Sequence, residues 1–250
     1  DVVVNTSTEN YASWNWKAGG TASSNTDGTI TSSVSANTDA GFSIVSYTGT
    51  GSAATIGHGL SSAPEMVIVK NRDQTDAWQV GSSKGIDFTD YLVLNDSAGP
   101  TDNVDRWNDT APSASVFTIG DGVEVNTNTE DYIAYCFHSV EGYSKVGSYE
   151  GNNNADGSFI YLGFRPAYVV IKDIDNAYDW HVFDDARDPY NAMYHYLRPS
   201  NAGVEGTTPI FGDFVSNGFK LRTATSGWND SSTHIYLAFA ESPFKTSNAR

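Results

Sequence analysis

The stretch that decides the fold is residues 47–80, YTGTGSAATIGHGLSSAPEMVIVKNRDQTDAWQV, because the chain carries a second version of it at residues 149–182. The two versions align without a gap at a constant offset of 102 positions. Self-similarity at a fixed offset indicates a duplicated supersecondary block. The matched pairs are Tyr47 and Tyr149, Gly49 and Gly151, Pro64 and Pro166, Val67 and Val169, Lys70 and Lys172, Asp73 and Asp175, and Trp78 and Trp180.

The alignment extends beyond this stretch and defines two blocks. It returns at Phe117 and Phe219, and the ends of the blocks match in turn: Ile133, Tyr135 and Phe137 correspond to Ile235, Leu237 and Phe239. Each block has about 100 residues, which is the usual size of one β-sandwich. We therefore predict two tandem β-sandwich-like repeat units, residues 41–141 and residues 142–250.

A third copy of the block ending lies at the start of the chain. Residues 5–11 resemble residues 126–132, and Trp14 and Trp16 follow in the places of Tyr135 and Phe137. We therefore predict that residues 1–17 form the final strand of a truncated preceding unit, and we expect a processed or excised part of a longer protein. Residues 18–40 contain few apolar side chains and are predicted to be a linker or surface arm.

The patterning within the blocks is that of an all-β protein. Residues 66–69 and 168–171 are short, β-branched apolar runs, typical of strands that are covered on both faces. Residues 133–137 alternate between larger and smaller or polar side chains, as expected of a strand with one face on a core. Turn signals such as Gly120-Asp121-Gly122 recur. Residues 139–145, between the units, do not look like a linker, so we expect the units to dock directly.

The composition narrows the functional classes. The chain has 250 residues and a formal net charge of −16, a balance that repels phosphate backbones and anionic lipids and disfavours nucleic-acid binding. It contains no run of about 18 apolar residues, so no membrane insertion is expected. The single cysteine, Cys136, excludes an intrachain disulfide and is predicted to be a small buried hydrophobe.

Four segments resemble a known protein family. They are residues 14–20 (WNWKAGG), residues 47–60, residues 142–145 (GYSK) and residues 163–172 (GFRPAYVVIK). In this order they resemble a repeat module of virion structural and tail-fibre-like proteins from tailed, especially marine, bacteriophages. The resemblance covers essentially the whole chain.

The resemblance implies a non-enzymatic viral protein located in the virion. Its expected role is that of a structural protein in a tail fibre, spike or other fibre, with a role in host attachment and receptor binding. Expected partners are other virion proteins, further copies of the chain in a homo-oligomer such as a trimer, and a host cell-surface glycan. The resemblance implies neither catalytic residues nor cofactors.

A glycan-binding lectin module is the first alternative. Two tryptophans lie in polar, turn-rich segments outside the 102-residue register, and an indole beside Asn and Asp can stack on a sugar while the polar groups bind its hydroxyls. The opposing interpretation is an aromatic lid packed on a sandwich edge, whereas the repeated Trp78 and Trp180 are predicted to be core residues. The candidate ligand-binding residues are Trp107, Asn108, Asp109, Trp228, Asn229 and Asp230.

A capsule polysaccharide depolymerase is the second alternative. Asp184, Asp185 and Asp188 form a dense carboxylate cluster, and glycoside hydrolysis requires two suitably placed carboxylates. The first unit lacks this cluster, so such a site would belong to the second unit alone. Metal binding is not expected: the acidic residues around Asp73 and Asp175 lack a calcium-loop pattern and suit turn capping, and the histidines lack zinc-like spacing.

Overall fold

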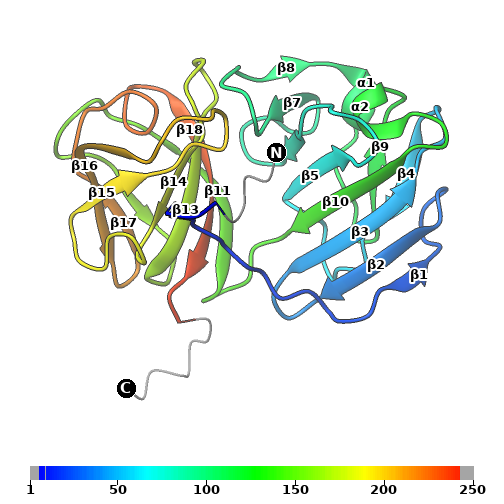
Figure 1. Ribbon diagram of the computed structural model, residues 1–250, viewed down its shortest axis with the longest axis horizontal. Helices are drawn as coiled ribbons and strands as arrows, with labels where there is room; N and C mark the ends of the chain where they lie inside the picture. Colours follow the sequence, from blue (N-terminus) through cyan, green and yellow to red (C-terminus); the bar gives the residue numbers. More distant parts are fainter. Residues whose placement is uncertain (1–5, 9, 243–250) are drawn as a thin grey trace.

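The protein is built almost entirely of antiparallel strands. The computed structural model describes residues 6–8 and 10–242, and Figure 1 shows two β bodies side by side. In these residues the only helices are α1 (Val104–Trp107) and α2 (Val123–Asn126), of four residues each. The predicted all-β class is confirmed.

The first unit is a sandwich of one large sheet and one small sheet. The small sheet pairs β4 (Ala54–Gly57) with β9 (Val116–Ile119). Between the two sheets lies a buried apolar core that includes Phe117 and Trp107. The large sheet has, in spatial order, β1 (Ser23–Asn25), β2 (Ser32–Asn37), β3 (Phe42–Thr48), β10 (Asp131–Phe137), β5 (Met66–Asn71), β6 (Gln79–Ser82), β7 (Asp90–Val93) and β8 (Thr101–Asp102).

The second unit repeats this plan with two four-stranded sheets. Its core between the sheets includes Phe211, Phe219 and Trp228. One sheet has the order β11 (Ser144–Glu150), β18 (Thr233–Ala240), β13 (Pro166–Asp173) and β14 (His181–Asp184). The other has the order β12 (Phe159–Tyr161), β17 (Gly218–Leu221), β16 (Gly206–Val215) and β15 (Met193–Tyr196).

The strand orders show that the sequence repeat is a structural repeat. The order β3-β10-β5-β6 in the first unit has the same sequence relations as β11-β18-β13-β14 in the second, and β4-β9 corresponds to β12-β17. Within the central strands the 102-residue offset is retained: Ile133 pairs with Lys70, and Ile235 pairs with Lys172.

A buried asparagine locks the same loop in each unit. The Asn126 side chain accepts from the Thr50 amide at 2.8 Å and donates to the carbonyls of Ser52 and Gly120 at 2.7 and 2.8 Å. The equivalent Asn229 accepts from the Asn152 amide at 3.1 Å. Its amide group donates to the carbonyls of Asn154 and Thr223 at 2.9 and 2.6 Å. One polar side chain thus satisfies three backbone groups that burial would otherwise leave unpaired.

The two units dock through the outer faces of two sheets, the large sheet of the first unit and the β11-β18-β13-β14 sheet of the second. In β10, Ala134 and Cys136 face the sandwich core, while Tyr135 and Phe137 face the second unit. In β18, Ala238 faces its own sandwich core and belongs to a different cluster from its neighbours on either side. The result is four stacked sheets, and β5 and β13 are covered on both faces as predicted. Direct docking of the units is confirmed.

Residues 18–40 do not form the predicted linker. They contain β1 and β2, and β2 pairs along the edge of β3, so the segment supplies two strands to the large sheet of the first unit. The few apolar side chains of the segment point inward, with Ile30 and Val34 buried in the first core. A strand at a sheet edge needs only such a sparse apolar face, which explains why the composition suggested a linker.

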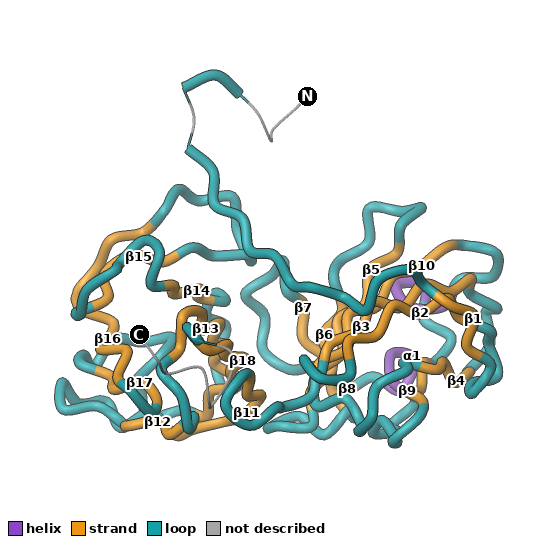
Figure 2. Tube along the Cα trace, turned by 90° about the horizontal axis from the view of Figure 1, so that it is seen from below, coloured by secondary structure: helices purple, strands orange, loops and turns teal. Residues whose placement is uncertain are grey.

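The predicted strand at residues 1–17 is also absent as a strand from the described part of this segment. Residues 10–17 run extended without ladder partners there, and residues 1–5 and 9 lie outside the described residues. The blue segment in Figure 1 and the N-terminal tube in Figure 2 cross from the second unit to the first. We call residues 10–17 the strap.

Candidate functional site at the junction of the two units

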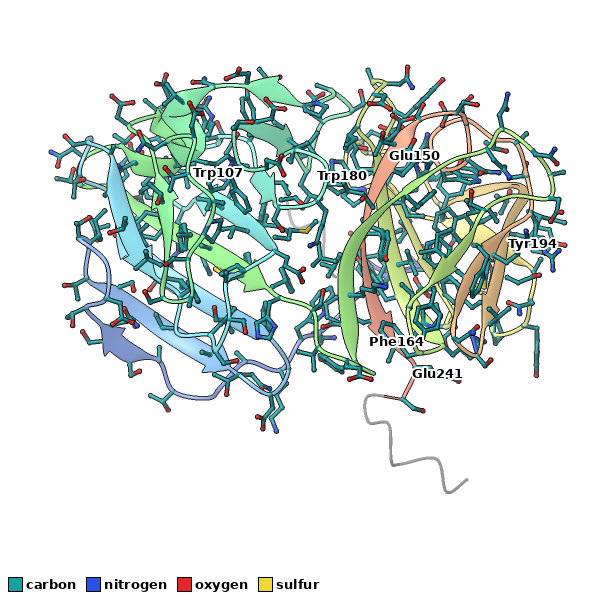
Figure 3. The ribbon with its side chains drawn as sticks, turned by 180° about the vertical axis from the view of Figure 1, so that it is seen from behind. Trp107, Glu150, Phe164, Trp180, Tyr194 and Glu241 are labelled. Carbon is teal, nitrogen blue, oxygen red and sulfur yellow. The ribbon has the colours of Figure 1, made fainter. Side chains whose placement is uncertain are left out.

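The junction is an aromatic-rich apolar layer between two sheets. Its residues come from both units because strand alternation gives each central strand a second apolar face. Trp180, labelled in Figure 3 at the boundary between the bodies, is buried, and its indole Nε1 donates to the carbonyl of Val93 at 2.9 Å. Trp78 is half-buried and stacks on Tyr135, with centroids 6.2 Å apart. Both repeated tryptophans therefore pack, but at the junction and not inside a sandwich.

Three equivalent positions of the repeated ending meet at this junction. Trp16 of the strap lies 6.5 Å from Phe137 and 5.4 Å from Phe239, measured between ring centroids. The rings of Phe137 and Phe239 are themselves 6.1 Å apart. Edge-to-face contacts at such distances stabilise an interface beyond the area they bury. Each copy of the ending thus supplies one ring to a shared cluster.

The third copy also keeps the local turn of the complete copy. Thr8 has φ 75° and the matching Thr129 has φ 72°. The Thr6 amide donates to the Tyr11 hydroxyl at 2.8 Å, as the Thr127 amide does to the Tyr132 hydroxyl at 2.8 Å.

The burial of the two tyrosines differs. Tyr132 is fully buried between the sheets of the first unit, whereas Tyr11 is 52% exposed. The face of the strap that would meet a sandwich core is therefore open.

A groove of about 470 Å³ opens beside the strap. Its volume lies within the range of small-ligand sites, and its walls are mainly apolar. The Trp14 indole Nε1 donates to Asp184 Oδ2 at 3.3 Å, which fixes one end of the strap on the second unit. The aromatic walls are Trp14, Trp16, Phe42, Trp78, Tyr135, Phe137, Tyr168 and Trp180.

The expected sugar-binding role of Trp107 is wrong. Its side chain is 0% exposed and packs against Phe88 in the first core. Asn108 ends α1 with φ 50°, and its backbone amide donates to the Val104 carbonyl. Asn108 and Asp109 are exposed, but no indole face lies open beside them for a sugar to stack on. This segment is therefore the aromatic lid of the opposing interpretation.

Trp228 is likewise not a stacking platform. It is 2% exposed and lies in the second core, and its carbonyl accepts from the Tyr149 hydroxyl at 2.7 Å. Asn229 is the buried loop lock described above, and Asp230 is partly buried. The two predicted triplets lie in separate units and do not form one site. Turn-rich sequence around an indole does not distinguish a lid from an open platform, since both need the same loop chemistry.

The carboxylates of the depolymerase alternative are largely engaged. Asp184 Oδ2 accepts from the Arg187 guanidinium at 2.7 Å, and Asp188 accepts from the amides of Tyr194 and His195. Burial would raise the pKa of Asp188, but these amide bonds and the His195 ring hold it below its usual value. Burial raises the pKa of Asp185. Asp185 therefore has the direction of shift that a general acid requires, and the depolymerase stays a prediction.

The residues considered for calcium divide into two kinds. Asn71 and Asp173 cap turns as predicted, because the Oδ1 of each accepts from the backbone amides two and three residues later. Asp73 and Asp175 do not cap their own turns: the Oδ2 of each accepts at 2.7 Å from the amide of a residue 58 positions later. Asp179 likewise accepts from the distant Ser200 hydroxyl at 2.8 Å.

The burial of the single cysteine agrees with the sequence. Cys136 is fully buried, and burial raises the pKa of its thiol to about 12, as expected of an unreactive core residue. Among the described residues, neither of the two short helices has the length or apolar character needed to cross a membrane.

The fold and the junction define the chain as a tandem β-sandwich protein whose two copies are fused through their outer sheet faces. The chain belongs to the family described as Domain of unknown function (DUF7483), whose profile matches residues 1–243. No match was found among curated proteins, and none among solved structures.

Proposed function

We propose that this protein is a non-enzymatic architectural module of a tailed-phage virion, part of a tail fibre, spike or similar fibre. The observation that carries the architectural part is the meeting of Trp16, Phe137 and Phe239, one ring from each copy of the repeated ending. Repeat proteins gain stability mainly from interfaces between neighbouring copies. The virion assignment rests on the resemblance of residues 14–20, 47–60, 142–145 and 163–172 to phage modules.

The strap supplies a way for such modules to join. It places Trp14 and Trp16 in the junction, while its other face is exposed and its backbone takes part in no β ladder with the described residues. Unpaired strand edges are templates for further strands. We therefore assign the strap as a joining strand that takes its lateral partners from a further copy of the repeat, within the same chain or from another chain of a homo-oligomer.

The location in the virion is tested by immunogold labelling of purified phage particles with antibodies raised against this chain. The proposal predicts gold at tail fibres, spikes or another fibre on every particle. If neither immunogold labelling nor mass spectrometry detects the chain in purified particles, the virion assignment is overturned.

The assembly is tested by sedimentation of the chain together with a Trp14→Ala/Trp16→Ala variant. The proposal predicts a concentration-dependent oligomer, a trimer in the simplest case, that the variant weakens. A wild-type chain that stays monomeric at micromolar concentration would contradict joining through the strap between chains.

Binding of a host-surface glycan is the second candidate, and it now rests on the groove. The half-buried ring of Trp78 and the two strap indoles offer aromatic faces, with the exposed Asn15 at the rim. A glycan array with Trp78→Ala as test variant and Tyr190→Ala as control checks this role. Binding that Trp78→Ala abolishes and the exposed Tyr190→Ala retains supports it; an array without binders removes it.

A further inference from the structure

One end of the second unit brings together a histidine and two aspartates that are far apart in sequence. Asp173 ends β13 and is the direct register partner of His234 near the start of β18. Asp230 lies in the turn before β18. His234 Nε2 is 3.1 Å from Asp230 Oδ1 and 3.6 Å from Asp173 Oδ2. Asp173 and His234 are fully buried, and Asp230 is partly exposed, so the cluster has one route to solvent.

The hydrogen bonds fix the orientation of the histidine. Its Nδ1 lies 2.9 Å from the carbonyl oxygen of Ser232. A carbonyl oxygen only accepts, so Nδ1 carries a hydrogen and donates it. Nε2 is then left facing two carboxylate oxygens, which in their ionised form also only accept. A buried nitrogen lone pair among acceptors requires an electrophile between them: a proton or a metal cation.

The surrounding groups hold the three side chains in place. Asp173 Oδ1 accepts from the amides of Asp175 and Asn176, both at 2.8 Å. The Tyr149 ring stacks on the imidazole at 4.9 Å with an interplanar angle of 6°. Metal-binding histidines commonly donate their other ring nitrogen to a carbonyl, and their carboxylate neighbours are themselves hydrogen-bonded. This cluster has both features.

The first unit provides an internal comparison with the same frame and different chemistry. Asn71, Thr127 and Tyr132 stand in the places of Asp173, Asp230 and His234. There the Asn71 amide group donates to Glu130 at 2.6 Å and to the Tyr132 hydroxyl at 3.2 Å, so the centre supplies its own donors.

The neighbouring lysines differ in burial and explain only part of the change. Lys70 is partly exposed, whereas Lys172 is fully buried and donates to the carbonyls of Asp173 and of Ser97 in the first unit. The Asp173 carboxylate favours the charged form of this buried amine, but the lysine accounts for neither Asp230 nor His234.

We propose that Asp173, Asp230 and His234 form a binding site for a divalent transition-metal ion of the Zn²⁺ class. One imidazole nitrogen and two carboxylate oxygens are a ligand set typical of this ion. Ligand atoms on a tetrahedral ion with bonds of about 2.1 Å are roughly 3.4 Å apart, close to the two separations around Nε2. A water molecule would complete the four-coordinate shell, since Asp230 is partly exposed to solvent. The ion would cross-link β13, β18 and the turn before β18.

The test is a Zn²⁺ titration of the chelator-treated chain by calorimetry, with thermal unfolding in parallel. The wild type is expected to bind one ion and to unfold at a higher temperature when loaded. Asp173→Asn and His234→Tyr place the first-unit residue at each position, so the frame tolerates both, and each should weaken binding at least about 100-fold. Asp230→Thr serves as a third variant at a less buried position. Asp121→Asn, at an exposed position, is the control and should bind as the wild type does.

Three outcomes would overturn the proposal. One is a wild type that binds no Zn²⁺ in the micromolar range. Another is binding that persists in His234→Tyr and Asp230→Thr, which would place the ion elsewhere on this acidic surface. The last is an unfolding temperature that neither chelator nor metal changes, which would leave the triad as a proton-sharing network.

Discussion

The two units share the buried asparagines that fix their loops, but they differ in the side chains where the two central strands meet at one end of each unit, which we call the tip. The buried Asn126 and Asn229 bind equivalent loops through equivalent atoms. The tips hold a neutral amide–phenol pair, Asn71 and Tyr132, in one unit and an ionisable pair, Asp173 and His234, in the other. Positions that satisfy buried backbone groups are thus retained after duplication, while side chains that need only satisfy one another can change together.

The periphery of the units differs as well. In the first unit, β7 pairs with β6 and so extends the large sheet. In the second unit, β15 pairs with β16 and so belongs to the sheet that does not face the junction. A single bridge, from Val182 of β14 to Leu197 just after β15, still links it to the junction sheet. The first unit gains β1 and β2 at its other edge. The central four strands and the junction they form are common to both, so we regard them as the essential frame.

The largest effect is expected from breaking the backbone locks. Asn126→Ala and Asn229→Ala should each lower the free energy of unfolding by about 4 kcal/mol, because each leaves several buried backbone groups unpaired. Chemical denaturation measures both. Since the comparison rests on equivalence, a large loss in one variant beside a negligible loss in the other would contradict it.

The next effect is a pH-dependent contribution to stability that only the second unit makes. Burial lowers the pKa of His181 to about 4, while Gln79 occupies the equivalent place in the first unit. In the unfolded chain His181 binds a proton near pH 6.5, whereas in the folded chain it stays neutral until about pH 4. The contribution is therefore complete above pH 6.5, and about 3 kcal/mol is lost as the pH falls to about 4. Denaturation across this window should show that His181→Gln flattens the profile; an unchanged profile would exclude His181 as the cause.

A smaller effect is expected at the strap. Trp16→Ala should cost about 2 kcal/mol, less than a fully buried aromatic, because Trp16 is half-buried. Tyr190→Ala, at an 84% exposed position, should change stability by less than about 0.5 kcal/mol. Equal effects in thermal unfolding would mean that the strap does not contribute to the junction.

The smallest effect concerns the shared turn. Thr129 is a β-branched residue at φ 72°, a strained conformation for such a side chain. Thr129→Gly should therefore raise the free energy of unfolding by about 0.5 kcal/mol. This is the net of the strain that is relieved and the larger conformational entropy that glycine loses on folding. Thr8→Gly should have no measurable effect, because the strap turn is exposed. Denaturation midpoints of the two variants sharpen the comparison between the turn at Thr129 and its copy at Thr8.

The frame was predictable from the sequence because its signals are repeated. The constant offset between residues 47–80 and residues 149–182 indicated two units. The apolar runs at residues 66–69 and 168–171 indicated strands that are covered on both faces. Residues 18–40 misled because an edge strand with one sparse apolar face has the composition of a linker. The sequence left Trp107 and Trp228 open between a sugar-stacking platform and an aromatic lid, because loop composition does not reveal whether an indole points inward.

The metal-binding triad was hidden by distance along the chain. Asp173 and His234 become neighbours only through the register of β13 with β18, which spacing rules for local motifs cannot detect. The repeat alignment did hold a signal: Asn71 becomes Asp173 and Tyr132 becomes His234, two changes toward ligand side chains at matched positions. Comparing the copies for such paired changes would have singled out the site.

The central claim, that the two sandwiches share one junction and form one body, is tested most directly by scanning calorimetry of the whole chain. The shared aromatic layer predicts a single unfolding transition whose calorimetric and van't Hoff enthalpies agree. Two separable transitions in the wild type, each with the enthalpy of about 100 residues, would show that the units fold independently and would contradict the claim.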